Sequence, residues 1–167
     1  IISLASLPFA FKHIAIMPDA HTGKGMPIGG VLATIGVVIP NAVGVDIGCG
    51  MCAVKTNLKA SELSVNQIKA IMRHIRKTIP LGFDHQKNAM DKSLLPDLDL
   101  DACPFLRNKT VAMLKEIGTL GGGNHFIEIQ KDTKKDDVWI MIHSGSRHVG
   151  LTVANYYNKQ AEILCER

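Results

Sequence analysis

Glycine clusters constrain the fold of this chain more than any other feature of its sequence. Three segments, residues 43–51, 118–125 and 143–147, combine glycine with side chains that can bind metal ions or phosphate. Glycine adopts backbone conformations that other residues avoid, and it lets other groups come close to the backbone. Short runs rich in β-branched residues flank these segments, at residues 13–17, 31–39, 53–56, 126–130 and 138–143. The pattern predicts strands joined by tight, shaped loops.

The first predicted helix begins at Val65. Ser64 and Gln67 have the spacing of a capping box, in which each side chain hydrogen-bonds the other residue's backbone amide. Apolar residues then follow a helical period until Pro80, which cannot continue a helix. This helix needs only a core to pack against, so no chemistry is assigned to it.

Two further helices complete the predicted fold. One covers residues 109–117, and the other begins at about Leu151. Residues 81–104 are rich in Asp, Pro and Lys without a regular period, which indicates an irregular surface segment. Strands and helices together predict an α+β fold with mixed sheets, glycine-rich loops and flanking helices.

Length and composition predict one globular domain. The chain has 167 residues, of which 46% are apolar and 20% are charged, and a disordered or fibrous chain would differ from this. It begins with Ile1 rather than Met and stops at Arg167 within a predicted helix. We therefore expect residues 1–167 to be a single, incomplete domain of a longer protein.

No segment is predicted to enter a membrane. The longest apolar stretch, residues 31–45, is interrupted by glycine, proline and polar residues, and a membrane span needs about 20 apolar residues. Four cysteines without a signal-like start indicate a reducing compartment, so a cytoplasmic location is expected. The net charge of +4 is compatible with a phosphate-bearing partner but is too small to select one.

The first glycine-rich segment places a carboxylate and a thiol three residues apart. Its glycines let the backbone fold back, so Asp46 and Cys49 can converge on one metal ion. A thiolate is a strong ligand that can bridge two ions, and a carboxylate suits manganese, zinc or iron. The pair Cys49 and Cys52 also matches half of a zinc site or a redox pair, but no second Cys or His pair with suitable spacing supports that reading.

The other two segments add imidazoles, an amide and a guanidinium. Asn124 and His125 follow three successive glycines, a backbone that suits phosphate binding. His143 ends an apolar run and is followed closely by Arg147, whose planar fork of N–H groups matches phosphate. Taken alone, His143 is better explained as a packed core residue; the hypothesis of a catalytic divalent-metal site depends on all three segments together.

Residues 18–25 form a fourth polar segment. Lys24 follows a glycine as in a phosphate-binding P-loop, but Pro18 and Gly25 occupy positions where that motif needs glycine and Ser or Thr. Asp19, His21 and Lys24 are candidates for contacting phosphate or supporting a metal ligand. A purely turn-forming role is equally compatible with the sequence.

Four motifs resemble those of a known family. Residues 17–25, 43–51, 118–128 and 143–147 are similar, in the same order, to successive motifs of the RtcB RNA-splicing ligases. The resemblance covers nearly the whole chain and corresponds to the N-terminal and central part of a typical member. It implies an RtcB-like fold, with this chain as an incomplete catalytic domain.

The resemblance implies a role for each candidate residue. Cys49 is expected to bridge two Mn²⁺ ions, with Asp46 and His125 on one ion and His143 on the other. The GTP-contacting residues are expected to be Asn124, His125, Phe126, Ile127 and Glu128. Arg147 is expected to hold a phosphate of the RNA end, with Asp19, His21 and Lys24 as further candidates.

The implied reaction joins an RNA 3′-phosphate or 2′,3′-cyclic phosphate end to a 5′-hydroxyl end, in tRNA splicing and RNA repair. It uses GTP and manganese, and archease is a frequent helper of the family. The family's GMP-accepting histidine lies in its C-terminal part, for which this chain has no motif, so no catalytic residue is assigned. The fragment is therefore expected to be inactive by itself.

Two alternatives remain open at this point. The chain is compatible with a degenerate metal- or RNA-binding module that lacks ligase activity. It is also compatible with a metal-dependent phosphohydrolase, which shares the ligand types but does not need the guanylate-contacting residues 124–128.

Overall fold

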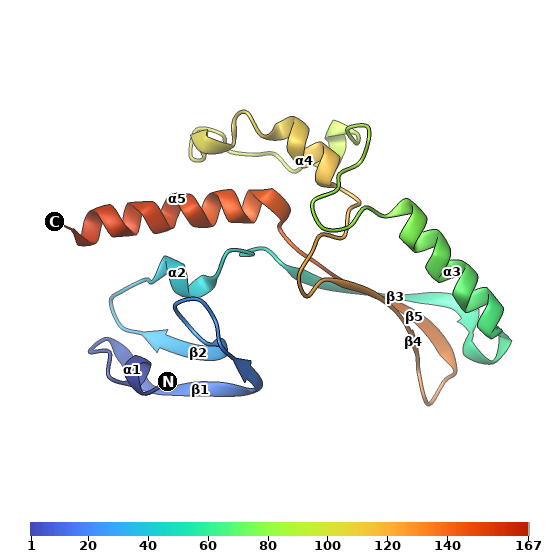
Figure 1. The fold of residues 1–167 in the computed structure, drawn as a ribbon, viewed down its shortest axis with the longest axis horizontal. Coiled ribbons are helices and arrows are strands. Elements are labelled where there is room, and N and C mark those ends of the chain that lie inside the picture. Colours follow the sequence, from blue (N-terminus) through green and yellow to red (C-terminus); the bar gives the residue numbers. More distant parts are fainter. Residues whose placement is uncertain (167) are drawn as a thin grey trace. The chain divides into compact units, whose positions relative to one another are not determined.

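The computed structural model describes residues 1–166, which form two compact units. One unit contains Ile1–Val45 and the C-terminal segment from Val153, and the other contains Asp46–Thr152. Each unit has its own antiparallel sheet (Figure 1). The combination of helices and antiparallel sheets confirms the α+β class.

The first unit is built on a two-stranded sheet. Its elements before the unit boundary are helix α1 (Ile2–Ala5), strand β1 (Ala10–His21), strand β2 (Ile28–Thr34) and helix α2 (Pro40–Val43). The register of β1 against β2 shifts between Ala10 and Ile14, and Lys12 in this interval has a φ of 59°. A residue in the left-handed region inside a strand is typical of a bulge, which bends the strand.

The strand predicted at residues 31–39 is wrong in its second half. β2 ends at Thr34, and Gly36 has a φ of 71°, which lies outside the β region. Pro40 then begins α2, because its fixed φ and missing N–H suit the first turn of a helix. Val37 and Val38 have β-branched side chains but lie outside the strands that the structure describes.

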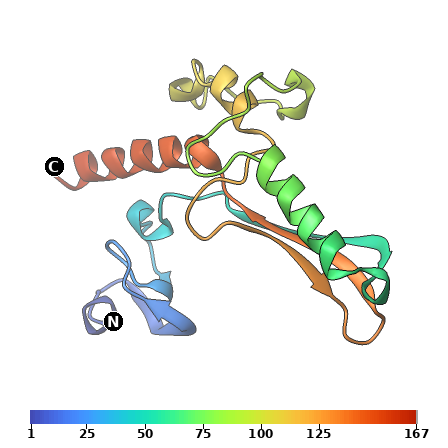
Figure 2. The same ribbon diagram turned by 45° about the vertical axis from the view of Figure 1, so that its right-hand side comes forward.

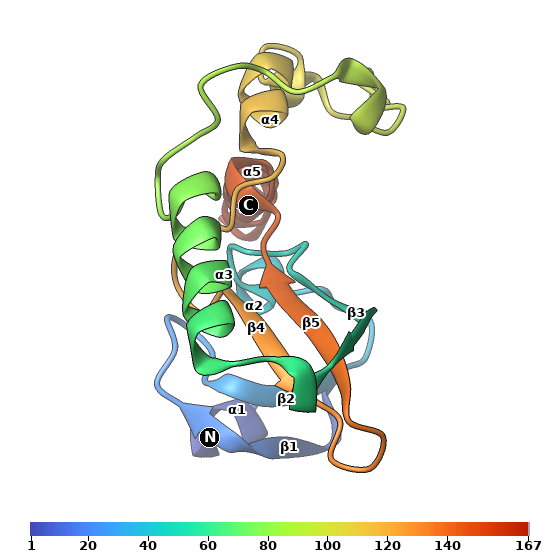
Figure 3. The ribbon, with the colours of Figure 1, turned by 90° about the vertical axis from the view of Figure 1, so that its right-hand side faces the viewer.

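The second unit contains a three-stranded sheet in the order β3-β5-β4 (Figure 3). The strands are β3 (Gly50–Lys59), β4 (Phe126–Lys131) and β5 (Asp137–Ser144), which confirms the strands predicted there. Met51 and Phe126 both pair with His143. The starts of β3 and β4 therefore lie beside the end of β5, and the three glycine-rich segments all leave the sheet from this edge.

A short turn joins β4 to β5. Oδ1 of Asp132 accepts hydrogen bonds from the amides of Lys134 at 2.8 Å and Lys135 at 3.1 Å. Asp136 has a φ of 58°, and Asp tolerates this left-handed conformation better than most residues. The local chemistry of two aspartates therefore accounts for the turn.

Asp137 links β5 to β3 through two ion pairs. Its side chain is 6% exposed and lies 2.6 Å from the amino groups of both Lys55 and Lys59. Hydrogen bonds from these lysines hold the pKa of Asp137 below its ordinary value. Hydrogen bonds from Ser61 likewise lower the pKa of the neighbouring Asp136.

Helix α3 (Val65–Thr78) begins with the predicted capping box. The hydroxyl of Ser64 accepts a hydrogen bond from the amide of Gln67 at 3.3 Å, and the Gln67 side chain accepts one from the amide of Ser64 at 2.9 Å. The helix ends at Thr78 because Pro80 forces Ile79 into an extended conformation, with a φ of −108°. In Figure 2, α3 lies alongside the sheet of the second unit.

Helix α4 (Thr110–Glu116) confirms the second predicted helix, whereas α5 (Arg147–Cys165) begins earlier than the predicted Leu151. Gly150 lies in its first turn, although glycine is uncommon inside helices. A Cβ atom at position 150 would collide with the hydroxyl of Ser146. Three short 3-10 turns cover Ala60–Glu62, Lys92–Leu94 and Pro104–Leu106, and residues 81–104 are otherwise irregular, as predicted.

Few apolar side chains are buried in the part of the chain that the structure describes. The buried ones are Leu106, Met113, Leu114, Val138 and Ala154. Many others face solvent, and Phe83 is 98% exposed. Within residues 1–166, no helix combines the length and the apolar character that crossing a membrane requires.

Replacing Asp137 with Asn should destabilise the folded chain at neutral pH and weaken its sensitivity to acid. The folded-state pKa of Asp137 is lowered, so its carboxylate stabilises the fold fully above the ordinary Asp pKa of about 3.9. That contribution is lost as the pH falls through the lower folded-state pKa. Thermal unfolding, followed by circular dichroism between about pH 2 and pH 7, measures the difference. Asp97→Asn, at an exposed position, should behave like the unmodified chain, and an unchanged pH profile in Asp137→Asn would contradict the assignment.

Candidate metal and phosphate site

Asp46, in the first glycine-rich segment, contacts the second segment through His125 and the third through Ser146. Its Oδ1 accepts hydrogen bonds from the amide of Ser146 at 2.8 Å and from the Ser146 hydroxyl at 2.5 Å. Its Oδ2 lies 2.8 Å from Nε2 of His125. The segments before β3, before β4 and after β5 therefore meet at a single carboxylate, as their departure from one edge of the sheet allows.

The environment of Asp46 keeps its carboxylate ionised. Partial burial raises the pKa of Asp46. Hydrogen bonds from the Ser146 hydroxyl and amide, together with the contact to His125, lower it by more, so the pKa lies below its ordinary value. The Asp46 side chain is 35% exposed, whereas that of His125 is 7% exposed. An ionised carboxylate beside a buried imidazole is a pair of donors suited to a divalent cation.

The absence of side chains at two glycines permits this approach. A Cβ atom at Gly145 would collide with Oδ2 of Asp46 and lie 2.5 Å from Cε1 of His125. A Cβ atom at Gly121 would collide with the guanidinium of Arg147 and lie 2.9 Å from Nδ1 of His125. Gly121 also has a φ of 90°, which only glycine adopts readily. These two glycines are therefore part of the site, although they contribute no donor atom.

His143 lies beside His125 with one ring nitrogen already engaged. The two ring centroids are 5.2 Å apart and the rings are nearly perpendicular. Nδ1 of His143 lies 3.2 Å from the carbonyl oxygen of Asn124, and a carbonyl can only accept, so this contact places the proton on Nδ1. Nε2 of His143 then carries the lone pair, which is the usual arrangement of a metal-binding histidine.

Cys49 is not brought into contact with the other candidate ligands. Its amide donates to the carbonyl of Asp46 at 3.4 Å, which closes a tight turn, but its side chain is exposed and its thiol is free. Within residues 1–166, no three His, Cys, Asp or Glu side chains gather closely enough to form a metal-binding group. The structure thus pairs Asp46 with His125 and places His143 next to His125, and it leaves Cys49 apart.

The donor set fits a divalent cation in two respects. Two ligands at right angles on one ion, with bonds of about 2.1 Å, lie about 3 Å apart, and the oxygen of Asp46 is 2.8 Å from the nitrogen of His125. Nδ1 of His125 is buried and has no hydrogen-bond partner among residues 1–166, so no hydrogen bond within the described chain fixes the tautomer of this ring through Nδ1. A carboxylate and two imidazoles suit manganese, zinc or iron.

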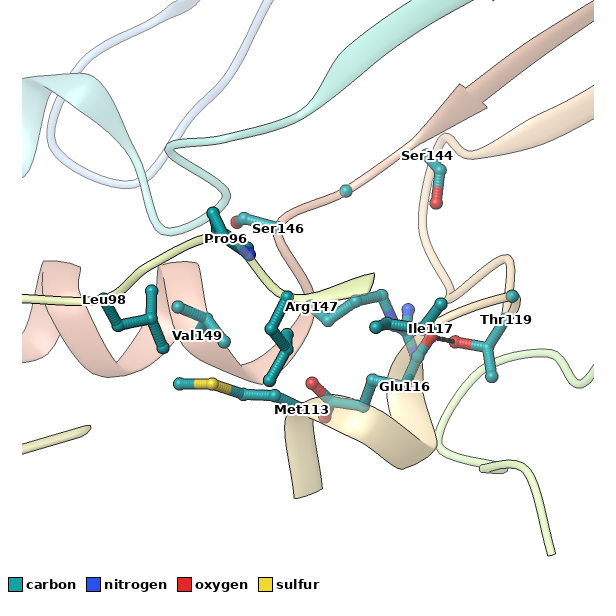
Figure 4. Close-up of a pocket in the computed structure, with 13 residues that line it drawn as sticks. Pro96, Leu98, Met113, Glu116, Ile117, Thr119, Ser144, Ser146, Arg147 and Val149 are labelled. Atoms are coloured by element: carbon teal, nitrogen blue, oxygen red, sulfur yellow. Dashed lines mark hydrogen bonds between the residues drawn. The ribbon is translucent and has the colours of Figure 1, made fainter. Parts of the chain in front are cut away.

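Arg147 lines a cavity of about 350 Å³ next to these residues (Figure 4). Its φ of 55° is rare for a residue with a side chain, and its Nη2 donates to the carbonyl of Gly82 at 3.0 Å. Nε of Arg147 is buried and has no acceptor among residues 1–166. Ser146 and the buried Glu116 also line the cavity. An unpaired N–H on a guanidinium is a donor available to an anion.

The predicted nucleotide-contacting run spans the end of a loop and the start of β4. Phe126 packs against His143 with ring centroids 5.6 Å apart, and Glu128 is exposed. Successive side chains of a strand point to opposite faces of the sheet. Phe126 and Glu128 therefore share one face, and Ile127 lies on the other, so the side chain of Ile127 is directed away from any ligand that the first two contact.

The remaining predicted residues lie in the first unit. Asp19 and His21 lie in the last part of β1, and Nδ1 of His21 is 2.8 Å from the carbonyl oxygen of Asp19. Lys24 is exposed in the connection between β1 and β2 and lines a cavity of about 850 Å³ with Asn41 and Asn158. Oδ1 of Asn158 is buried without a partner among residues 1–166.

The sequence did not single out Ser146, which supports the candidate ligand Asp46. It lies in the third glycine-rich segment, but its sequence position gives no sign that both its amide and its hydroxyl bind Asp46. The carbonyls of Leu120 and Gly82 also hold the site together, by accepting hydrogen bonds from Ser144 and Arg147. Backbone carbonyls carry no sequence signal, so these contacts required the structure.

Comparison with known proteins gives the family of the chain. The profile of tRNA-splicing ligase RtcB matches residues 1–102 and 102–167. The chain belongs to the RtcB family. This confirms the resemblance of the four motifs, and three of the four RtcB-like motifs are the segments that meet at Asp46.

Named RtcB proteins share much of this sequence. The RNA-splicing ligase RtcB of Escherichia coli strain K12 is 44% identical over 172 residues, which cover 94% of this chain and 42% of that protein. The tRNA-splicing ligase RtcB of Thermococcus kodakarensis is 31% identical over 93% of this chain and 42% of its own length. The tRNA-splicing ligase RtcB of Methanococcus maripaludis is 31% identical over 97% and 43%. The chain thus spans less than half the length of these RtcB relatives.

Replacing Gly145 with Ala should separate Asp46 from His125. The new methyl group has no room beside the two side chains, and overpacking of this kind costs about 1–3 kcal/mol of stability. Thermal unfolding measures the loss, and the ¹⁵N shifts of the His125 ring report the broken contact. Gly50→Ala is the matched control, because no atom lies within 4 Å of the added methyl group. Equal effects of the two substitutions would contradict the steric role of Gly145.

Proposed function

We propose that this chain is the metal-binding part of a GTP- and manganese-dependent RNA ligase. The reaction would join RNA 3′-phosphate or 2′,3′-cyclic phosphate ends to 5′-hydroxyl ends, in tRNA splicing and RNA repair. The observation that supports it best is the meeting of three RtcB motifs at Asp46, with His125 at 2.8 Å and Ser146 at 2.8 Å. The names of the RtcB relatives, which are RNA- and tRNA-splicing ligases, give the reaction class.

Two Mn²⁺ ions would be held by Asp46, Cys49, His125 and His143. When bound, the ions would neutralise the triphosphate of GTP and orient an in-line displacement. Ser146 keeps Asp46 ionised and aimed, and the carbonyl of Asn124 fixes the tautomer of His143. Cys49 stands at the end of the turn that Asp46 begins, and its exposed, free thiol would have to move towards the other three ligands to bind with them.

The remaining residues would bind the nucleotide and the RNA. We assign GTP contacts to the run Asn124–Glu128, with Phe126 and Glu128 on the face shared with His143. Arg147 would hold a phosphate of the RNA end in the adjacent cavity, which it lines. Asp19, His21 and Lys24 remain proposed phosphate contacts of the first unit.

We propose that the chain acts as part of a longer ligase and is inactive by itself. It covers 42% of the E. coli relative, and the histidine that accepts GMP in the family has no counterpart among its motifs. The exposure of large apolar side chains, such as Phe83 at 98% and Val38 at 85%, supports further protein packing against it. Archease and a cytoplasmic setting belong to the same proposal.

Mn²⁺ binding to this chain tests the metal assignment directly. Cys49→Ser should weaken binding at least roughly tenfold, because a thiolate ligand is lost. Cys52→Ser is the matched control: both thiols are exposed and free, but Cys52 lies within β3 and away from the turn of Asp46. Isothermal titration calorimetry with MnCl₂ measures both. Equal affinities of the two variants would remove Cys49 from the site.

Adduct formation in a longer protein that contains this chain tests the reaction. Labelled GTP and manganese should give an acid-labile protein–GMP adduct, lost in Cys49→Ala, and joined RNA ends should follow. Metal binding without adduct or ligation would favour the alternative of a degenerate metal- or RNA-binding module. Release of phosphate from simple esters without GTP would favour a phosphohydrolase.

A further inference from the structure

The net positive charge of the chain is confined to one segment outside the candidate site. Between residues 63 and 90, five Lys and Arg residues accompany one acidic residue, Asp84. Of the 19 basic and 15 acidic residues in the whole chain, 14 of each lie elsewhere. The formal charge of +4 is therefore the charge of this segment, which contains α3 and the loop after it.

Helix α3 presents four of these cations in one stripe. Residues spaced by three or four positions share a helix face, which places the four within a sector of about 100°. We call this stripe the α3 basic face: Lys69, Arg73, Arg76 and Lys77. All four are exposed, and within residues 1–166 none of them forms an ion pair or a side-chain hydrogen bond.

The stability of the helix does not account for the α3 basic face. Like charges at these spacings repel, so Arg73 is destabilised by both Lys69 and Lys77. Cations in the last turn interact favourably with the helix dipole, which explains Arg76 and Lys77 but neither of the earlier two. The helix itself contains no acidic residue that would offset the repulsion. An anionic partner outside the helix would offset this repulsion.

The basic face continues into a polar cavity at the C-terminal end of α3. This cavity measures about 730 Å³, and Arg76, Lys77, His85 and Lys87 are among the residues that line it. Asp84 is its one acidic residue. Guanidinium and ammonium groups that converge on one cavity suit the oxygens of a phosphate group.

We propose that the α3 basic face binds the phosphate backbone of an RNA strand and that the adjoining cavity receives one of its phosphates. The choice of RNA as the polyanion rests on the proposed function. A lipid surface fits less well. On the apolar side of α3, Ile68 is exposed but Ile71, Met72 and Ile75 are partly covered, whereas an interfacial helix inserts that whole side into the membrane. The face offers charge without groups arranged to read bases, so binding is independent of sequence.

A triple substitution on the helix tests the proposal. Lys69, Arg73 and Lys77 are replaced by Gln, which matches Lys and Arg in helix propensity. The matched control replaces three exposed lysines of the same unit, Lys92, Lys134 and Lys135. Each protein is titrated against a short fluorescent single-stranded RNA with a 5′-phosphate and a 3′-hydroxyl, ends that the proposed ligation does not use. Circular dichroism verifies that the helix content is retained.

The α3 variant should bind RNA roughly tenfold more weakly, and the slope of log affinity against log salt should fall by about 2. The control should change affinity by less than about twofold. Equal weakening in both variants would show diffuse charge attraction and overturn the proposal. The proposal would also be overturned if the protein bound phosphatidylserine vesicles but not RNA, and if the α3 variant lost this vesicle binding.

The two proposals fail in different experiments. Intact metal binding and adduct formation together with an unaffected α3 variant would refute the RNA-binding face alone. Loss of RNA affinity in the α3 variant, in a protein that neither binds Mn²⁺ nor forms an adduct, would refute the ligase assignment alone.

Discussion

The hydrogen bonds that converge on Asp46 are the constraint on which the candidate site depends. They join residues separated by 100 positions, to Ser146, and by 79 positions, to His125. Closing such long loops costs several kcal/mol of chain entropy, while a hydrogen bond to a charged group returns about 1.5–3 kcal/mol. Pairing of the strands therefore brings the ends of these loops together, because β3 and β4 begin, and β5 ends, at one edge of the sheet. The hydrogen bonds to Asp46 then fix loops that already lie close to one another.

The same convergence explains why Gly145 and Gly121 are required at the site, although neither glycine contributes a ligand atom. At Gly145 and Gly121, a single methyl group would occupy the space of an imidazole, a carboxylate or a guanidinium. Arg147 is held in the left-handed region between these contacts, and strain of this kind persists only where the surroundings over-determine it. Its side chain is thereby turned towards Gly82 and the neighbouring cavity. Packing of backbone against side chain, more than burial of apolar groups, shapes this part of the molecule.

Local patterns in the sequence predicted what local interactions determine. The capping box of Ser64 fixed the start of α3, and short runs rich in β-branched residues located β4 and β5. The errors arose at Gly150, which serves a close contact inside α5, and at residues 37–39, whose side chains are strand-like but lie outside the strands that the structure describes. In the site, residue types predicted that Asp46 and Cys49 converge, and the family resemblance alone placed Asp46 with His125. The supporting Ser146 was not predicted, because its effect depends on the direction of an amide that only the fold determines.

The charges of the second unit fall into two groups. In the candidate site they are matched locally, since Asp46 faces His125 and Arg147 donates to a backbone carbonyl, and a site for reacting ends needs few groups in fixed geometry. The exposed cations of α3 are unmatched, which suits attraction to a polyanion from solution. Salt screens exposed charges within about 8 Å at physiological ionic strength but affects partly buried pairs much less. Docking through α3 and ligand binding at Asp46 should therefore respond differently to ionic strength. Docking through α3 depends on the release of counterions, whereas binding at Asp46 depends on directed bonds inside the fold.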